Sequence, residues 1–225
     1  MPRSQRADVA NIIYHVINRS NARMAIFEKD NDFLAFLEVL HEAKEKFSVE
    51  VLAFCIMPNH WHLILKPLEN GQLSRFMGWL TMTHTQRFHA NHHTVGTGHL
   101  YQGRYKSFPV QTDEYFIQLV RYVERNPLRA KLVKKAQDWK WGSLYIRLKG
   151  SKEQKQLLSS WPIPPSRNYL KLVNTIQPKT EVDLIRTSIV RNRPLGNEKW
   201  VQHAAEDLGL TSSLRNPGRP KKNGS

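Results

Sequence analysis

Four side chains in this sequence have the types and spacing of a metal-assisted nucleophilic site. His60 and His62 flank a single tryptophan, and Tyr122 precedes Asn126 by four positions. Imidazole and carboxamide groups can bind divalent ions, and a phenol placed beside a bound phosphate can attack it. The set therefore suits cleavage of a phosphodiester, provided that the fold brings the two pairs together.

The histidine pair lies in a short apolar segment, residues 60–66, that we predict to be a strand. Side chains two residues apart on a strand point to the same face, so His60 and His62 would project together while Trp61 and Leu63 face the other way. Two imidazoles can hold an ion and leave positions open for a phosphate oxygen. For an isolated His-x-His, however, one loop histidine and one surface histidine is the simpler interpretation.

The tyrosine and the asparagine lie in a predicted helix that starts near Thr112 or Asp113. Its apolar positions at helical spacing are Phe116, Leu119, Val120 and Val123. The helix should end or kink near Asn126, because Pro127 disfavours helical geometry in the residue before it. Tyr122 and Asn126 then share one side of the helix, beside the apolar stripe. Taken alone, they would be an edge-of-core residue and a helix-terminal residue.

The charge balance indicates a polyanionic partner. The 225 residues include 34 Lys+Arg against 19 Asp+Glu, a formal net charge of +15. An excess of this size favours nucleic acid, bound through its phosphates, with a membrane surface as the lesser alternative. Arg121, Arg125 and Arg129 form a row beside the predicted nucleophile, which is either a solvated charged face or a surface that binds a phosphate backbone.

The single cysteine and the N-terminus bear on the compartment. Cys55 lies within an apolar run, so we expect a buried core thiol in a reducing compartment rather than a nucleophile. Residues 1–8 lack the apolar stretch of a secretory signal, and no segment is long enough to cross a bilayer. We therefore expect a cytoplasmic protein that does not associate with a membrane.

The elements that must position these groups follow from the apolar periodicity. We predict strands and helices, with Asp32 as a helix N-cap, at 12–17 (strand), 33–47 (helix), 49–57 (strand), 60–66 (strand), 72–90 (helix) and 104–111 (strand). The continuously apolar segment 49–57 is typical of a central strand covered on both faces. The β-α-β-β-α-β order, followed by the helix that carries Tyr122, predicts an α+β fold: a ferredoxin-like split βαβ antiparallel sheet with helices packed on one face.

A catalytic domain is expected over residues 1–150 and a basic C-terminal extension over residues 151–225. The periodic pattern weakens after Trp141, and Trp161-Pro162-Ile163-Pro164-Pro165 has the composition of a stiff connector. The extension is expected to be mostly helical or irregular, with a short helix over residues 198–208 and a flexible basic tail.

Four ordered segments carry a more specific signal than the isolated residues. They are Tyr14-His15-Val16-Ile17-Asn18-Arg19, Met57-Pro58-Asn59-His60-Trp61-His62-Leu63-Ile64-Leu65, Gln102-Gly103-Arg104-Tyr105-Lys106-Ser107 and Tyr122-Val123-Glu124-Arg125-Asn126-Pro127-Leu128-Arg129-Ala130. Together they resemble the HUH-type single-tyrosine transposases, most closely the subgroup associated with repetitive extragenic palindromes (REP). The resemblance covers most of residues 11–145. Residues 139–143 are similar to the family's tryptophan-serine segment, with Gly142 where serine is more usual.

The resemblance implies that His60 and His62 bind a divalent cation, Mg²⁺ or Mn²⁺, with Asn126 as a third ligand. Tyr122 would attack the scissile phosphate of single-stranded DNA that carries a hairpin, leaving a 3′ hydroxyl and a 5′-phosphotyrosine adduct. Because the adduct keeps the phosphodiester energy, the strand could be transferred to a new end without a nucleotide cofactor. The side chains expected to contact the DNA are Arg19, Arg104, Lys106, Arg121, Arg125 and Arg129.

The resemblance also bears on assembly and on the C-terminus. The REP-associated subgroup is expected to act as monomers, whereas related transposases pair and share active sites, so a homodimer stays open. Arg193-Pro194-Leu195-Gly196 and Trp200 resemble the subgroup more loosely. Gly218-Arg219-Pro220-Lys221-Lys222 is similar to a minor-groove hook, and a disordered basic tail is the alternative.

Two other functions compete with strand transfer. A domesticated DNA-binding or regulatory protein would keep the fold and have little catalysis. A histidine phosphoesterase would need two separated His-x-Ser/Thr motifs, and His92-His93-Thr94 is the one match. Five histidines between residues 84 and 99 have irregular spacing, which favours a solvated helix end and loop over a second metal site.

Overall fold

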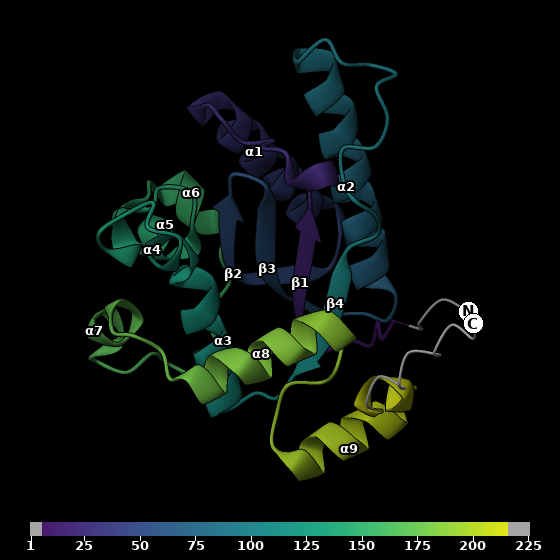
Figure 1. Cartoon of the computed structure of the whole chain (residues 1–225), viewed down its shortest axis with the longest axis vertical. Coiled ribbons are helices and arrows are strands. Elements are labelled where there is room, and N and C mark those ends of the chain that lie inside the picture. Colours follow the sequence, from purple (N-terminus) through teal and green to yellow (C-terminus); the bar gives the residue numbers. More distant parts are fainter. Residues whose placement is uncertain (1–5, 216–225) are drawn as a thin grey trace, which may run out of the picture.

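In the computed structural model, which describes residues 6–215, four strands form one antiparallel sheet (Figure 1). The strands are β1 (Ile13–Arg19), β2 (Val49–Met57), β3 (His60–Pro67) and β4 (Lys106–Val110). Their order in the sheet is β2-β3-β1-β4, with α1 (Asp30–Lys46) between β1 and β2 and α2 (Gln72–Asn91) between β3 and β4. This is the ferredoxin-like split βαβ arrangement, and it confirms the predicted fold class.

Helices cover both faces of the sheet because both sets of alternating strand residues are apolar. The first face, under α1 and α2, carries the core residues Tyr14, Val16, Trp61 and Leu63. The second face carries Ile13, Ile64 and Phe108 under α3 (Glu114–Glu124). Helices α1 and α2 pack on one face, as expected. The helix α3 was also predicted, but its position on the opposite face was not.

Strand β2 lies at the edge of the sheet, so the prediction that it is a central strand was wrong. It is nevertheless buried, because residues 141–161 cover its outer edge and satisfy its backbone groups. Ile56 N donates to Trp141 O at 2.9 Å, and Ser159 N donates to Val51 O at 2.8 Å. A covered edge has the same apolar composition as a central strand.

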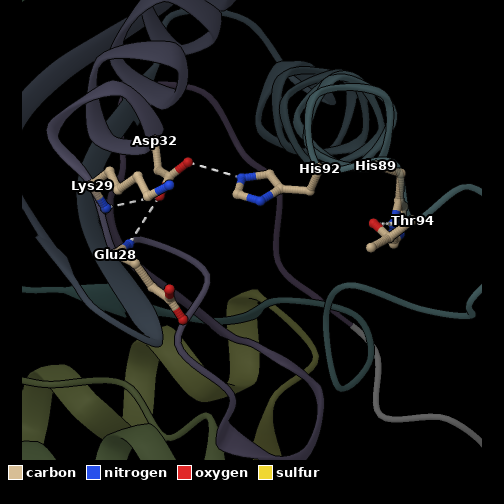
Figure 2. A network of polar contacts seen from close by, with 6 residues as sticks. All are labelled: Glu28, Lys29, Asp32, His89, His92 and Thr94. Carbon is tan, nitrogen blue, oxygen red and sulfur yellow. Dashed lines mark hydrogen bonds and ion pairs between the residues drawn. The ribbon is translucent and has the colours of Figure 1, made fainter.

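Asp32 is the third residue of α1 and not its N-cap, because the helix begins at Asp30. Its Oδ2 accepts hydrogen bonds from the backbone N–H groups of Glu28 and Lys29, at 3.0 and 2.9 Å. Its Oδ1 pairs with His92 Nε2 at 2.9 Å, which ties the start of α1 to the end of α2 (Figure 2). The predicted N-cap was therefore three residues too late, because Asp32 is the N3 residue whose side chain bonds back to the residues that precede the helix.

The remaining helices belong to the second half of the chain. They are α4 (Asn126–Arg129), α5 (Ser143–Lys149), α6 (Lys152–Gln156), α7 (Tyr169–Asn174), α8 (Lys179–Arg191) and α9 (Glu198–Asp207), with 3-10 turns at Asn21–Arg23, Ala136–Asp138 and Thr211–Leu214. The predicted helix at 198–208 is confirmed by α9, whereas no helix was predicted at the positions of α4 to α8. Across residues 6–215, every helix is too short or too polar to span a membrane.

The C-terminal extension packs against the sheet and α3, and it contributes to the core on the second face of the sheet. Leu195 is fully buried; its N–H donates to Pro109 O at 2.9 Å, and its carbonyl accepts from Gln111 N at 2.8 Å, so this segment runs along the edge of β4. Cys55 is buried in the same core, as predicted, and burial raises the pKa of its thiol. The possible hook at residues 218–222 lies outside the described residues.

Candidate functional site

An open cleft of about 680 Å³ lies on the face of the sheet that carries α3. Its walls come from the end of β1, the start of β3, residues 102–106, the α3–α4 junction and α8. The cleft brings together His60, His62, Tyr122 and Asn126, which sequence analysis had taken as one set. Within the described part of the chain, no acidic side chain lines it.

The two histidines reach the cleft because β3 forms as predicted. In the sheet His60 is paired with Arg19 and His62 with Ile17, and both imidazoles lie on one face, with ring centroids 5.1 Å apart. Trp61 lies on the opposite face, in the core under α1 and α2. His62 is 2 % exposed, whereas His60 is half-buried at the start of the strand.

Each histidine has its Nδ1 held by a neighbour, which leaves its Nε2 as the nitrogen available to a ligand. His60 Nδ1 is 2.6 Å from Asn59 Oδ1. The Asn59 amide is oriented by its Nδ2, which donates to Arg23 O at 3.2 Å, so His60 Nδ1 carries the proton. His62 Nδ1 is 2.9 Å from His15 Nε2, a contact that allows either ring to donate.

His15 is a residue that sequence analysis did not single out as functional. It is fully buried on β1, where its ring also packs on Phe108, with centroids 4.8 Å apart. In the described chain its Nδ1 has no hydrogen-bond partner. The signal was present, because a histidine within an otherwise apolar strand needs a polar partner on a neighbouring strand. Which partner it finds depends on the register of β1 with β3.

The imidazoles of His60, His62 and the adjoining His15 are held neutral, because burial lowers the pKa of each. Burial, together with the positive charges of Arg19 and Arg129, lowers the pKa of His60 to about 4. Burial lowers the pKa of His15 to about 3, and burial with the neighbouring imidazoles lowers the pKa of His62 well below its usual range. The neutral ring is the form that binds a metal ion.

Tyr122 and Asn126 flank a one-residue break in the helix, close to where Pro127 was expected to cause one. Helix α3 ends at Glu124, and α4 begins at Asn126, but Arg125 between them keeps right-handed helical dihedrals, φ −83° and ψ −5°. The turn therefore continues closely enough for both side chains to line the cleft. They are each 5 % exposed.

Arg129 links the two residues of this pair. Its Nη2 donates to Asn126 Oδ1 at 2.8 Å, and its guanidinium carbon lies 4.2 Å from the centroid of the Tyr122 ring. The Tyr122 ring also stands edge-on to the ring of His62, with centroids 6.0 Å apart and an interplanar angle of 86°. The phenol, the carboxamide and one imidazole are thus in one contact group, with a cation over the phenol ring.

A buried carboxylate anchors the end of α3 between Tyr122 and Asn126. Glu124 is 3 % exposed, and its two oxygens accept from Ser143 Oγ at 2.6 Å and from Tyr169 Oη at 2.7 Å. Ser143 Oγ in turn accepts from the backbone N–H of Phe54 at 3.1 Å. Burial raises the pKa of the Glu124 carboxyl. The network fixes α3 against β2, α5 and α7, and sequence analysis gave Glu124 no such role.

The predicted DNA-contact residues separate into two groups. Arg19, Arg104, Lys106 and Arg129 line the cleft, and Arg121 and Arg125 do not. Arg121 is 6 % exposed and donates through Nη2 to the carbonyls of Thr175 and Ile176, both at 3.2 Å. Its guanidinium therefore joins α3 to the loop before α8. Arg125 is partly buried, and burial with the nearby charges of Arg121 and Arg129 lowers its pKa.

Helix α8 forms a part of the cleft that the sequence motifs did not predict. Arg186, Ile189 and Val190 of α8 line it. Val182, Ile185 and Ile189 recur at helical spacing in the sequence, and this periodicity could have predicted the helix. Its place beside the cleft depends on contacts between distant parts of the chain.

Comparison with known proteins gives a family and a fold. Residues 8–126, more than half of the chain, match the family model described as transposase IS200 like. A solved REP-associated tyrosine transposase bound to a REP hairpin is 16 % identical, with a TM-score of 0.55, over 74 % of this chain and 96 % of that one. A putative transposase from Deinococcus radiodurans R1 is 20 % identical, with a TM-score of 0.39, over 54 % of this chain and 95 % of that one. Among curated proteins, none matches this sequence.

Proposed function

The chain belongs to the family of IS200-like transposases, and on that premise we propose that it cleaves and transfers single-stranded DNA with Tyr122 as the nucleophile. One observation carries the proposal: Tyr122 and Asn126 share a cationic cleft with His60 and His62, although the two pairs lie far apart in the sequence. A phenol, a carboxamide and two neutral imidazoles in one cleft form a set suited to attack on a phosphodiester.

In the proposed reaction, the Tyr122 oxygen forms a bond to the phosphorus and the bond from phosphorus to the 3′ oxygen breaks. The phenol loses its proton, and the departing 3′ oxygen gains one from solvent. Arg129, whose guanidinium lies over the Tyr122 ring, is placed to stabilise negative charge on the phenol oxygen and on the phosphate. Attack of a new 3′ hydroxyl on the 5′-phosphotyrosine reverses these steps and joins the strand to a new end.

The donor set fits a divalent cation, for which we propose Mg²⁺ or Mn²⁺. His60 and His62 would supply Nε2, and Asn126 Oδ1 keeps a lone pair beside its bond from Arg129. A bound ion would polarise a non-bridging phosphate oxygen. The set relies on a carboxamide as third ligand; within residues 6–215 no three His, Cys, Asp or Glu side chains are grouped to hold a metal.

We further propose that the substrate carries a hairpin and that one chain suffices. The solved relative is bound to a REP hairpin, which supports the same class of DNA here. The cleft carries Arg19, Arg104 and Lys106 with no carboxylate among its described lining residues, as a phosphate backbone requires. All four proposed site residues come from one chain, which supports a monomer.

Cleavage of single-stranded DNA from the flanks of the protein's own coding region tests the proposal. Incubation with Mn²⁺ or Mg²⁺ should release a shortened strand and a protein–DNA adduct, and EDTA should abolish both. Hairpin binding without cleavage, with and without metal and across many flanking sequences, would reject it in favour of a DNA-binding protein with little catalysis.

A further inference from the structure

One wall of the cleft lies outside the part of the chain that matches the family model. That match ends at residue 126, whereas α8 begins at Lys179 and supplies Arg186, Ile189 and Val190 to the cleft. In Figure 1, α8 crosses in front of β4, and its buried Ile185 belongs to the core on the face away from α1 and α2. The cleft is therefore built partly by the C-terminal extension.

Helix α8 is held firmly at both ends. Before its start, Gln177 Nε2 donates to Gln118 O of α3 at 3.0 Å, and Arg121 binds the carbonyl groups of residues 175 and 176. After its end, Leu195 pairs with the edge of β4. Between these anchors Ile185 and Ser188 are buried, at 0 and 1 % exposure. The side of α8 that faces the cleft is thus a fixed surface.

That surface is cationic and apolar. The side chains of Arg186 and Asp183 are 58 % and 52 % exposed, and the ion pair between them is long, at 3.9 Å, so water screens it strongly. Val190 is 69 % exposed although it is apolar. The other charged residues that line the cleft are all cations, so Arg186 adds to a positive field that nothing in the cleft lining neutralises. A polyanion with apolar parts is the occupant that fits both properties.

We propose that α8 is a DNA-binding element of this cleft. Arg186 binds a phosphate that flanks the one attacked by Tyr122, and Ile189 and Val190 contact the sugar or base of the adjoining nucleotide. The inference rests on the proposed function, because the same strand must occupy the cleft. It specifies unpaired nucleotides, since the faces of bases are open to side chains in a single strand and stacked within a hairpin stem.

Fluorescence anisotropy with the full-length protein tests this assignment. The probes are an oligothymidine of about 20 nucleotides, longer than the ~4–16 nucleotides that single-strand-binding OB-fold domains cover, and a blunt DNA hairpin without single-stranded tails. Arg186→Ala should weaken oligothymidine binding about fivefold and lower the slope of log affinity against log salt by about 0.7, the value for one lost phosphate contact. Val190→Ser, which removes the apolar contact without adding a charge, should also weaken oligothymidine binding, and both variants should bind the blunt hairpin like the wild type.

Two further variants serve as controls. Arg167→Ala removes an exposed charge outside the cleft and should leave both affinities unchanged. Arg186→Lys keeps the charge and should retain most of the affinity, which separates loss of a contact from loss of folding.

The outcomes separate this inference from the proposed function. If the wild type forms the Tyr122 adduct but the α8 variants bind oligothymidine normally, α8 is a structural wall and the inference fails alone. Equal weakening of oligothymidine and blunt hairpin would also overturn it, because Arg186 would then act only through the general positive field. Absence of the adduct in the wild type would instead reject the proposed function.

Discussion

At the scale of single residues, the arrangement of His62 depends on His15. His15 Nε2 and His62 Nδ1 are 2.9 Å apart on neighbouring strands, and both rings are buried. If His62 Nδ1 donates to His15 Nε2, the lone pair of His62 Nε2 is free for a metal ion, so metal binding would select that tautomer. His15 would then act as a positioning residue that touches neither the metal nor the DNA.

Replacing His15 tests this arrangement. His15→Phe keeps an aromatic ring against Phe108 but removes the acceptor, and we expect Mn²⁺ affinity to fall by about 10–100-fold, the usual effect of losing a partner of a metal ligand. His15→Gln retains an acceptor and should recover part of the loss. Isothermal titration with Mn²⁺ measures the affinity, and thermal unfolding checks that each variant is folded. If His15→Phe binds Mn²⁺ like the wild type, His15 does not position His62.

Among the secondary-structure elements, local sequence patterns predicted the strand that carries His60 and His62. They did not predict how the neighbouring elements pack around it. Strand β3 and helix α2 lie close to their predicted positions, because local alternation and helical spacing specify them. The edge position of β2 could not be predicted, since a cover supplied by residues 141–161 makes it as apolar as a central strand. The anchoring of Glu124 likewise depends on partners far along the chain.

Ser143 provides the element-scale test, because it joins β2, α3 and α5 through one hydroxyl. Ser143→Ala leaves the Phe54 N–H without its acceptor and the Glu124 carboxylate with one donor fewer, in a buried setting. We expect unfolding free energy to fall by about 1–3 kcal/mol. Urea denaturation should show a lower midpoint, while Ser160→Ala at an exposed position serves as the matched control. Equal midpoints for the two variants would show that the network does not stabilise the fold.

At the scale of the whole molecule, the fold buries several histidines as neutral rings. One of them, His84, ends a hydrogen-bond chain in which Trp61 Nε1 donates to Tyr101 Oη at 3.0 Å and Tyr101 Oη donates to His84 Nδ1 at 2.7 Å. Burial lowers the pKa of His84 to about 3. A proton on His84 Nδ1 would remove the acceptor of this chain, so protonation opposes folding.

Stability should therefore fall on acidification. The unfolded chain takes up protons on histidine near pH 6.5, whereas folded His84 does so only near its pKa of about 3. Its contribution is fully present above about pH 6.5 and is lost as the pH falls from there toward 3. His84→Gln can keep an acceptor but does not titrate, so its deficit relative to wild type should shrink with acidification in urea unfolding. Parallel pH curves for the two proteins would contradict the neutral state of His84.

The residues of the site could be predicted from the sequence only in part. The motif residues His60, His62, Tyr122 and Asn126 meet in one cleft, as the HUH resemblance implied. The cationic lining was predicted in part, because basic residues could be named but not sorted into exposed ones such as Arg104 and buried ones such as Arg121. That division is set by where α8 and its preceding loop dock, which no local pattern specifies.

A covalent bond between Tyr122 and DNA would be visible as a protein–DNA adduct in a denaturing gel. With hairpin-bearing single-stranded DNA from its own flanks and Mn²⁺, the wild type should give a band of altered mobility. Tyr115→Phe, which changes a partly buried tyrosine of α3 outside the cleft, should give the same band, and Tyr122→Phe should give none. An adduct of undiminished yield with Tyr122→Phe would show that Tyr122 is not the nucleophile.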